Sequence, residues 1–149
     1  MTKKAFIKYL SVTVLAAVLI IGYVFFDEKS LQSSGKSNTS TVVQQLSDGD
    51  SEGVKQRLAD FVGDGVASDD YEKALLSIDH VSRLIDEEGV ELSLVGDSMR
   101  KVEGTWIYGA VYILPATQGG EDFLLITMSR RDGVWVLANT QLAASNPLE

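Results

Sequence analysis

The sequence predicts an α+β fold, in which an N-terminal transmembrane helix is followed by two helices packed on a curved antiparallel sheet of about four strands. Three observations predict it: an uncharged apolar run near the N-terminus, apolar residues at helical spacing between Asp50 and Gly89, and apolar–polar alternation from Val90 onward. They divide the 149 residues into a cytoplasmic N-terminus (1–8), a transmembrane helix (9–26), a flexible linker (27–47), a folded domain (48–143) and a tail (144–149).

The apolar run extends from Tyr9 to Phe26 and contains eighteen residues without a charge. As a helix it would rise about 27 Å, at about 1.5 Å per residue. That length is close to the hydrocarbon thickness of a bilayer, roughly 30 Å. Lys3, Lys4 and Lys8 precede the run and no acidic residue does, which places the N-terminus in the cytoplasm and the rest of the chain outside.

A cleavable signal peptide is the alternative interpretation of this run. Its apolar region would be shorter and would end at a site of small residues. This run ends in Val24-Phe25-Phe26, which is bulky, so a retained signal anchor is favoured. The sequence therefore predicts a single-pass protein of the inner, or cytoplasmic, membrane with a periplasmic or other extracytoplasmic domain.

The part of the chain that follows Phe26 is strongly acidic. It holds ten basic and 21 acidic residues, a formal net charge of −11. Such a surface repels phosphate backbones and anionic headgroups, so neither nucleic acid nor a second electrostatic membrane contact is expected. Cysteine is absent from the sequence, which excludes disulfides, thiolate nucleophiles and cysteine-ligated metals.

Two helices are predicted before the strands. Residues 27–47 are rich in Ser and Thr, a composition typical of a flexible tether. A first helix is expected to begin near Asp50 and a second at Ser68 or Asp69, with Gly89 ending it. The apolar faces are Val54, Leu58, Phe61 and Val62 in the first helix, and Tyr71, Ala74, Leu75, Ile78, Val81, Leu84 and Ile85 in the second.

The strands are predicted from alternation and turn residues. A turn is expected at Gly96-Asp97-Ser98, then a strand from Met99 that continues or bulges at Gly104 and reaches Leu114. A hairpin of 123–131 and 134–142 turns at Asp132-Gly133, a strong two-residue turn signal. That turn would place Arg130 opposite Trp135, as a candidate cation–π pair, Met128 opposite Leu137, and Ile126 opposite Asn139.

This order of elements, with Asp132, Gly133, Trp135 and Leu137 in a late hairpin, resembles the NTF2-like (cystatin-like cone) superfamily over roughly residues 50–142. The resemblance implies a curved sheet wrapped on helices. The first helix is short for that superfamily. Members with one N-terminal membrane helix occur among bacterial secretion-system components and envelope proteins. The superfamily includes enzymes, ligand binders and scaffolds, so the resemblance selects no single function.

The candidate site is an aromatic patch of Trp106, Tyr108 and Tyr112, which share one face of a predicted strand. These rings would either line a ligand pocket or pack against the helices or a dimer partner, and packing is the favoured interpretation. His80 is the only histidine. Its neighbour Asp79 points about 100° away on a helix, so no catalytic pair is expected.

The segment Asp48–Gly53 begins like a calcium-binding loop. The position that requires a bidentate glutamate would be Ala59, so an acidic helix N-terminus is expected instead. No catalytic residue, metal or cofactor is predicted. The leading hypothesis is a protein-interaction or assembly module that binds another envelope protein or a second copy of itself. The alternatives are a small-molecule-binding domain with an aromatic pocket, and an NTF2-like hydrolase or isomerase that uses His80 with a carboxylate.

Overall fold

The structure is a computed structural model, which describes residues 26–62, 68–115 and 121–147. The predicted transmembrane segment, residues 9–26, lies outside these ranges except for Phe26. In the ranges described, no helix is both long and apolar enough to cross a membrane. Residues from Ser34 onward form one compact unit, called the domain below.

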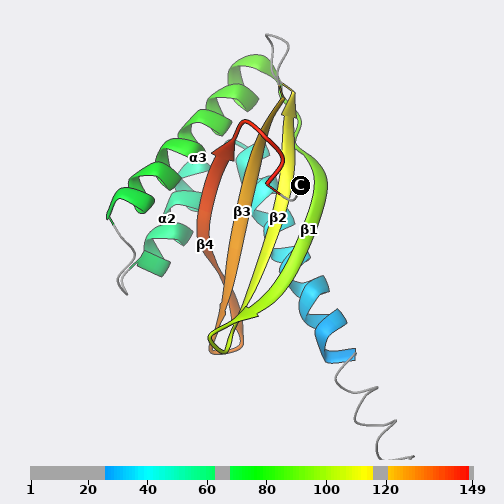
Figure 1. Ribbon diagram of the computed structural model, residues 1–149. Helices are drawn as coiled ribbons and strands as arrows, with labels where there is room; N and C mark the ends of the chain where they lie inside the picture. Colours follow the sequence, from blue (N-terminus) through cyan, green and yellow to red (C-terminus); the bar gives the residue numbers. More distant parts are fainter. Residues whose placement is uncertain (1–25, 63–67, 116–120, 148–149) are drawn as a thin grey trace, which may run out of the picture. The chain divides into compact units, whose positions relative to one another are not determined.

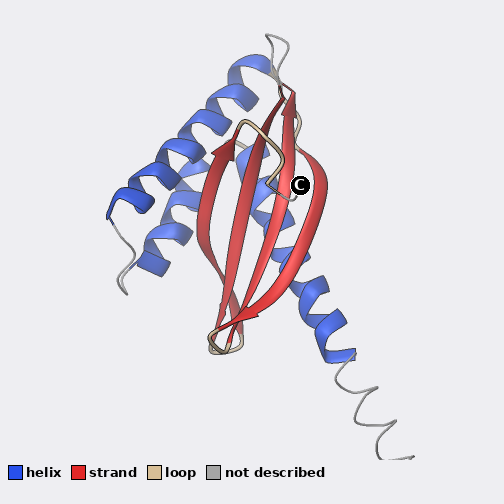
Figure 2. Cartoon of the chain, viewed as in Figure 1, coloured by secondary structure: helices blue, strands red, loops and turns tan. Residues whose placement is uncertain are grey.

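The chain is α+β, as predicted, with helices first and strands second (Figure 1). The described helices are a helical segment over residues 26–47, α2 (Ser51–Val62) and α3 (Ser68–Glu88). The strands are β1 (Ser93–Val102), β2 (Thr105–Pro115), β3 (Glu121–Arg131) and β4 (Val134–Ala143). All neighbouring strands are antiparallel in the order β1-β2-β3-β4, and the helices from Ser34 onward cover one face of this meander (Figure 2).

The prediction of a flexible linker over residues 27–47 was wrong, because these residues are helical. Gly35, Thr39, Val42 and Leu46 follow at helical spacing, and all four are buried. The exposed hydroxyl residues are compatible with the helix because their side chains bond to its own carbonyls; Thr41 Oγ1, for example, donates to Ser37 O at 3.0 Å. The domain therefore contains part of a third helix that composition alone did not indicate.

The bounds of α2 and α3 agree with the predicted helices. Asp50 caps α2, since its Oδ1 accepts a hydrogen bond from Gly53 N at 3.0 Å. This confirms that the acidic segment before α2 is a helix start. Gly89 ends α3 in the left-handed region, with φ of 64°, and its N–H donates to Ile85 O at 3.1 Å.

The turn between β1 and β2 lies at Glu103-Gly104, so the turn predicted at Gly96-Asp97-Ser98 was wrong. Both turn residues are left-handed, with φ of 48° and 86°, as a type I′ hairpin requires. Gly96 to Ser98 lie inside β1, just after a register shift between Leu94 and Gly96. The shift is a β-bulge, which explains why the local sequence has the composition of a turn while the strand continues.

The β3–β4 hairpin turns at Asp132-Gly133 as predicted, with φ of 49° and 81°. Arg130 pairs with Trp135 and Met128 with Leu137, which confirms the predicted register near the turn. Ile126 lies opposite Thr140 rather than Asn139, because the register shifts between Thr127 and Met128. That irregularity places one more residue on β4 than on β3, and a sequence pattern does not reveal it.

The core lies between the helices and the face of the sheet that they cover, called the inner face below. Thr140 ties the two layers together, since its Oγ1 donates to Ala74 O of α3 at 2.9 Å. The stripe predicted for α3 lies in or against this core, and the helical side also includes Val54 and Leu58 of α2. Val42 and Leu46 of the segment 26–47 complete it, while Phe61 of the predicted α2 stripe is not part of the cluster. The buried residues of the cluster are Val42, Leu46, Val54, Leu58, Ala74, Ile78, Val81, Tyr108, Ala110, Tyr112, Leu114, Leu124, Ile126, Met128, Trp135 and Leu137.

Candidate functional site

The predicted aromatic patch lies on the inner face of the sheet. Tyr108 has no exposed surface and Tyr112 is buried, while Trp106 is half-buried at the margin of the core. The Tyr108 ring meets the Trp135 ring edge-on, with centroids 6.2 Å apart. Lys101 Nζ lies 5.5 Å from the centroid of the Trp106 ring. The structure therefore places the three aromatic residues in and beside the packed core.

A partly buried hydrogen bond fixes the Tyr108 hydroxyl. The hydroxyl donates to Asp97 Oδ2 at 2.6 Å. Burial raises the pKa of Tyr108 above its ordinary value, and the bond to the Asp97 carboxylate raises it further. The phenol is thus held neutral, as a donor to a carboxylate on the neighbouring strand, and this arrangement joins β1 to β2 through side chains.

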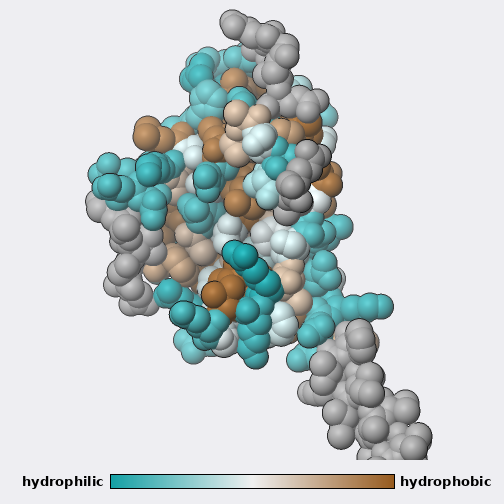
Figure 3. Space-filling model, viewed as in Figure 1, coloured by the Kyte–Doolittle hydropathy of each residue, from teal (hydrophilic) through white to brown (hydrophobic). Residues whose placement is uncertain are grey.

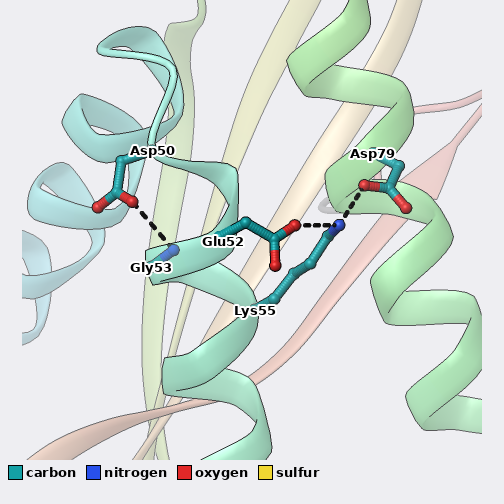
Figure 4. A network of polar contacts seen from close by, with 5 residues as sticks. All are labelled: Asp50, Glu52, Gly53, Lys55 and Asp79. Carbon is teal, nitrogen blue, oxygen red and sulfur yellow. Dashed lines mark hydrogen bonds and ion pairs between the residues drawn. The ribbon is translucent and has the colours of Figure 1, made fainter.

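Charged residues between α2 and α3 form a second polar group. Lys55 Nζ lies 2.6 Å from Asp79 Oδ1 and 2.8 Å from Glu52 Oε1 (Figure 4). The hydrogen bonds to Asp79 and then to Glu52 raise the pKa of Lys55. The Asp79 carboxylate is therefore engaged by α2, while the neighbouring His80 has its Nδ1 3.3 Å from Arg83 Nη2. The described structure records no hydrogen bond or ion pair between Asp79 and His80, although both line the hollow described next.

A shallow hollow of about 500 Å³ lies beside these residues, between α3 and the end of β4. Its lining is mostly apolar and includes Leu76, His80 and Leu142. Within the part of the chain that the structure describes, no group of three or more His, Asp or Glu residues is arranged to hold a metal ion.

A pocket of about 350 Å³ lies on the opposite side of the sheet, called the outer face below. Its centre is one row of the register: Ser98 of β1 pairs with Gly109 of β2, which pairs with Thr127 of β3. Since Gly109 has no side chain, the middle strand is open there. A Cβ built on it would lie 3.7 Å from Leu125 Cδ1, an ordinary contact. The lining residues are Ser98, Arg100, Ile107, Gly109, Leu125, Thr127 and Pro147.

Sequence reasoning did not predict this pocket. The available signal was Gly109, a glycine inside a strand and on the face opposite to the aromatic residues. The hydroxyls of Ser98 and Thr127 flank Gly109 from two different strands. They lie in one row only in the observed register, and the wrong prediction of a turn that included Ser98 excluded that register. Figure 3 views this side of the sheet, where hydrophobic and hydrophilic side chains are interspersed.

The outer edge of β1 is a further candidate surface. β1 pairs with β2 and has no other strand beside it in the described sheet. Leu94, Val95 and Val102 are 39%, 43% and 42% exposed, which makes them half of the large hydrophobic residues found exposed in the described ranges. An apolar sheet edge is a surface that another chain can cover.

The chain was compared with protein-family models, with curated proteins and with solved structures, and none of them gave a match.

Proposed function

We propose that this chain is a single-pass membrane-anchored envelope protein whose extracytoplasmic domain is a protein-interaction or assembly module. The observation that carries the proposal is the exposed apolar edge of β1. Soluble proteins usually protect a sheet edge with charges, bulges, prolines or a covering segment. β1 has a bulge and the exposed charges of Arg100 and Lys101, yet it also exposes Leu94 and Val95 near its start and Val102 at its end. A partner that adds a strand or packs along this edge would remove these side chains from water.

The anchor in this proposal is residues 9–26, with the lysines before it in the cytoplasm. Only residues 27–33 separate it from Ser34, where the domain begins. Even a fully extended chain of that length spans no more than about 30 Å. The domain therefore works close to the bilayer, and its partner is another envelope protein or a second copy of the chain. The proposed NTF2-like character agrees with this role, since that superfamily includes scaffolds.

Site-specific photo-crosslinking in native membranes tests the proposal. A photoreactive amino acid replaces Val95 or Val102 in the full chain, and a matched control carries it at Lys73, which is exposed on α3 and outside the hollow described above. We expect one defined adduct from both β1 positions and none from position 73. Mass spectrometry of the adduct distinguishes a second copy from a different protein.

The opposite result is equally clear. If both β1 positions gave only monomer while the variants remained folded and membrane-bound, the edge would not be an interaction surface. Equal adducts from β1 and from position 73 would also overturn the proposal, because they would indicate collision rather than a specific interface.

A further inference from the structure

We infer that the pocket on the outer face of the sheet binds a small amphipathic anion, an apolar molecule that carries one carboxylate. This site is separate from the β1 edge and does not depend on the proposed interaction role. The inference rests on three features of the pocket as its described residues line it: its shape, one cation, and no carboxylate among those residues.

The shape comes from the register of three strands. Gly109 forms the floor, and the side chains of Ile107 and Leu125, from neighbouring rows of the same face, form apolar walls. Pro147, beyond the end of β4, adds a wall from the C-terminal segment. A volume of about 350 Å³ lies at the lower end of the range for small-molecule sites, about 300–1,000 Å³. The space therefore suits a compact ligand.

The cation is Arg100, which lines the pocket from β1. No carboxylate of the described chain lies within ion-pair distance of its guanidinium, whereas Lys55 and Arg83 both have such partners. The guanidinium is always charged and presents paired donors that match the two oxygens of a carboxylate. Ser98 and Thr127 add two hydroxyls at the same level of the sheet.

The net charge of the chain and the charge of Arg100 further narrow the class of ligand that the pocket can bind. The residues after Phe26 carry a formal net charge of −11, so a polyanion is repelled as it approaches. One arginine compensates one negative charge, and the apolar walls favour a hydrocarbon or aromatic body. A monocarboxylate with such a body satisfies both conditions, whereas a neutral analogue loses the contact with Arg100.

Ligand binding by the full chain in lipid nanodiscs tests the inference, with empty nanodiscs as the blank. The probes are 4-phenylbutyrate and its neutral isostere 4-phenylbutanamide, and their affinities are measured by titration with ligand-detected NMR. We expect saturable binding of the acid and binding of the amide that is at least about tenfold weaker, a difference of about 1.4 kcal/mol. No saturable binding of the acid, or equal affinities for acid and amide, would overturn the inference.

Variants locate the site. Arg100→Gln is expected to lower the affinity for the acid about tenfold and to leave the affinity for the amide unchanged. Gly109→Val fills the floor and is expected to abolish binding of both, and Leu125→Trp is a second filling variant from another strand. Arg83→Gln changes an exposed arginine on α3 and keeps binding intact. If the acid bound equally well to the folded filled variants, the pocket would not be its site.

Discussion

Gly35 lies directly against the ring of Tyr108. A Cβ built on Gly35 would be 2.7 Å from Tyr108 Cγ and 2.9 Å from its Cδ2, closer than real side chains approach. The helix that contains Gly35 therefore packs on β2 through its backbone. The Tyr108 ring is in turn held by Trp135 and by the hydrogen bond to Asp97, so it has little room to move.

Gly35→Ala is expected to destabilise the domain by about 1–3 kcal/mol, because a methyl group overlaps a fixed ring. Helix propensity alone predicts the opposite, a gain of about 1 kcal/mol for alanine over glycine within a helix. Urea unfolding of the full chain in detergent measures the difference. Ser37→Ala, at an exposed position of the same helix, is the control and should be neutral or slightly stabilising. A stabilised Gly35→Ala variant would contradict the packing.

Tyr108→Phe is expected to cost about 1.5–3 kcal/mol of unfolding free energy, since it removes a bond to a charged acceptor. Asp97→Asn keeps an acceptor at the same place and should cost less. The same unfolding assay compares both variants with the unchanged chain. Equal stability of Tyr108→Phe would show that water replaces the hydroxyl without loss.

The domain is expected to lose stability as the pH rises above the ordinary tyrosine pKa of about 10. The pKa of Tyr108 is raised in the folded state, so the folded chain keeps a proton that the unfolded chain releases. The contribution of the neutral phenol is thus complete below that pH and is lost above it. Unfolding curves measured at increasing alkaline pH should show that the unfolding free energy falls less steeply with pH for Tyr108→Phe than for the unchanged chain. Equal slopes for the two chains would refute the assignment to Tyr108.

Lys55→Met is expected to reduce stability by about 0.5–1 kcal/mol at low ionic strength, because it removes the ion pairs with Asp79 and Glu52. Salt screens these pairs, so the difference from the unchanged chain should shrink at high salt. Lys73→Met, which removes an exposed lysine of α3, is the matched control. A salt-independent effect of Lys55→Met would indicate lost packing instead.

The sequence predicted those parts of the fold that local pattern determines. The apolar stripe of α3 and the Asp132-Gly133 turn are each encoded within one short stretch of sequence, and both were predicted with the right bounds. The Glu103-Gly104 turn was missed because glutamate rarely adopts a left-handed φ and carries no turn signal of its own. The neighbouring Gly96-Asp97 pair is the commoner turn composition, yet it belongs to a bulged strand.

The helix over residues 26–47 was missed for a different reason. Its buried face holds Val42 and Leu46 but also Gly35 and Thr39, a glycine and a polar residue, so the apolar spacing is interrupted. A glycine is required at position 35 because the Tyr108 ring packs against it, and that ring comes from a strand more than seventy residues later in the chain. The outer pocket was missed for a similar reason, since Ser98, Gly109 and Thr127 come together only when three strands are in register.

The packing of residues 34–47 also has a mechanical consequence. A flexible linker between a bilayer and a domain would extend under tension before any force reached the domain. Here the chain enters the domain as a helix whose Val42 and Leu46 are completely buried. Tension applied at Ser34 would therefore load the contacts of that helix with the sheet, among them the contact between Gly35 and Tyr108.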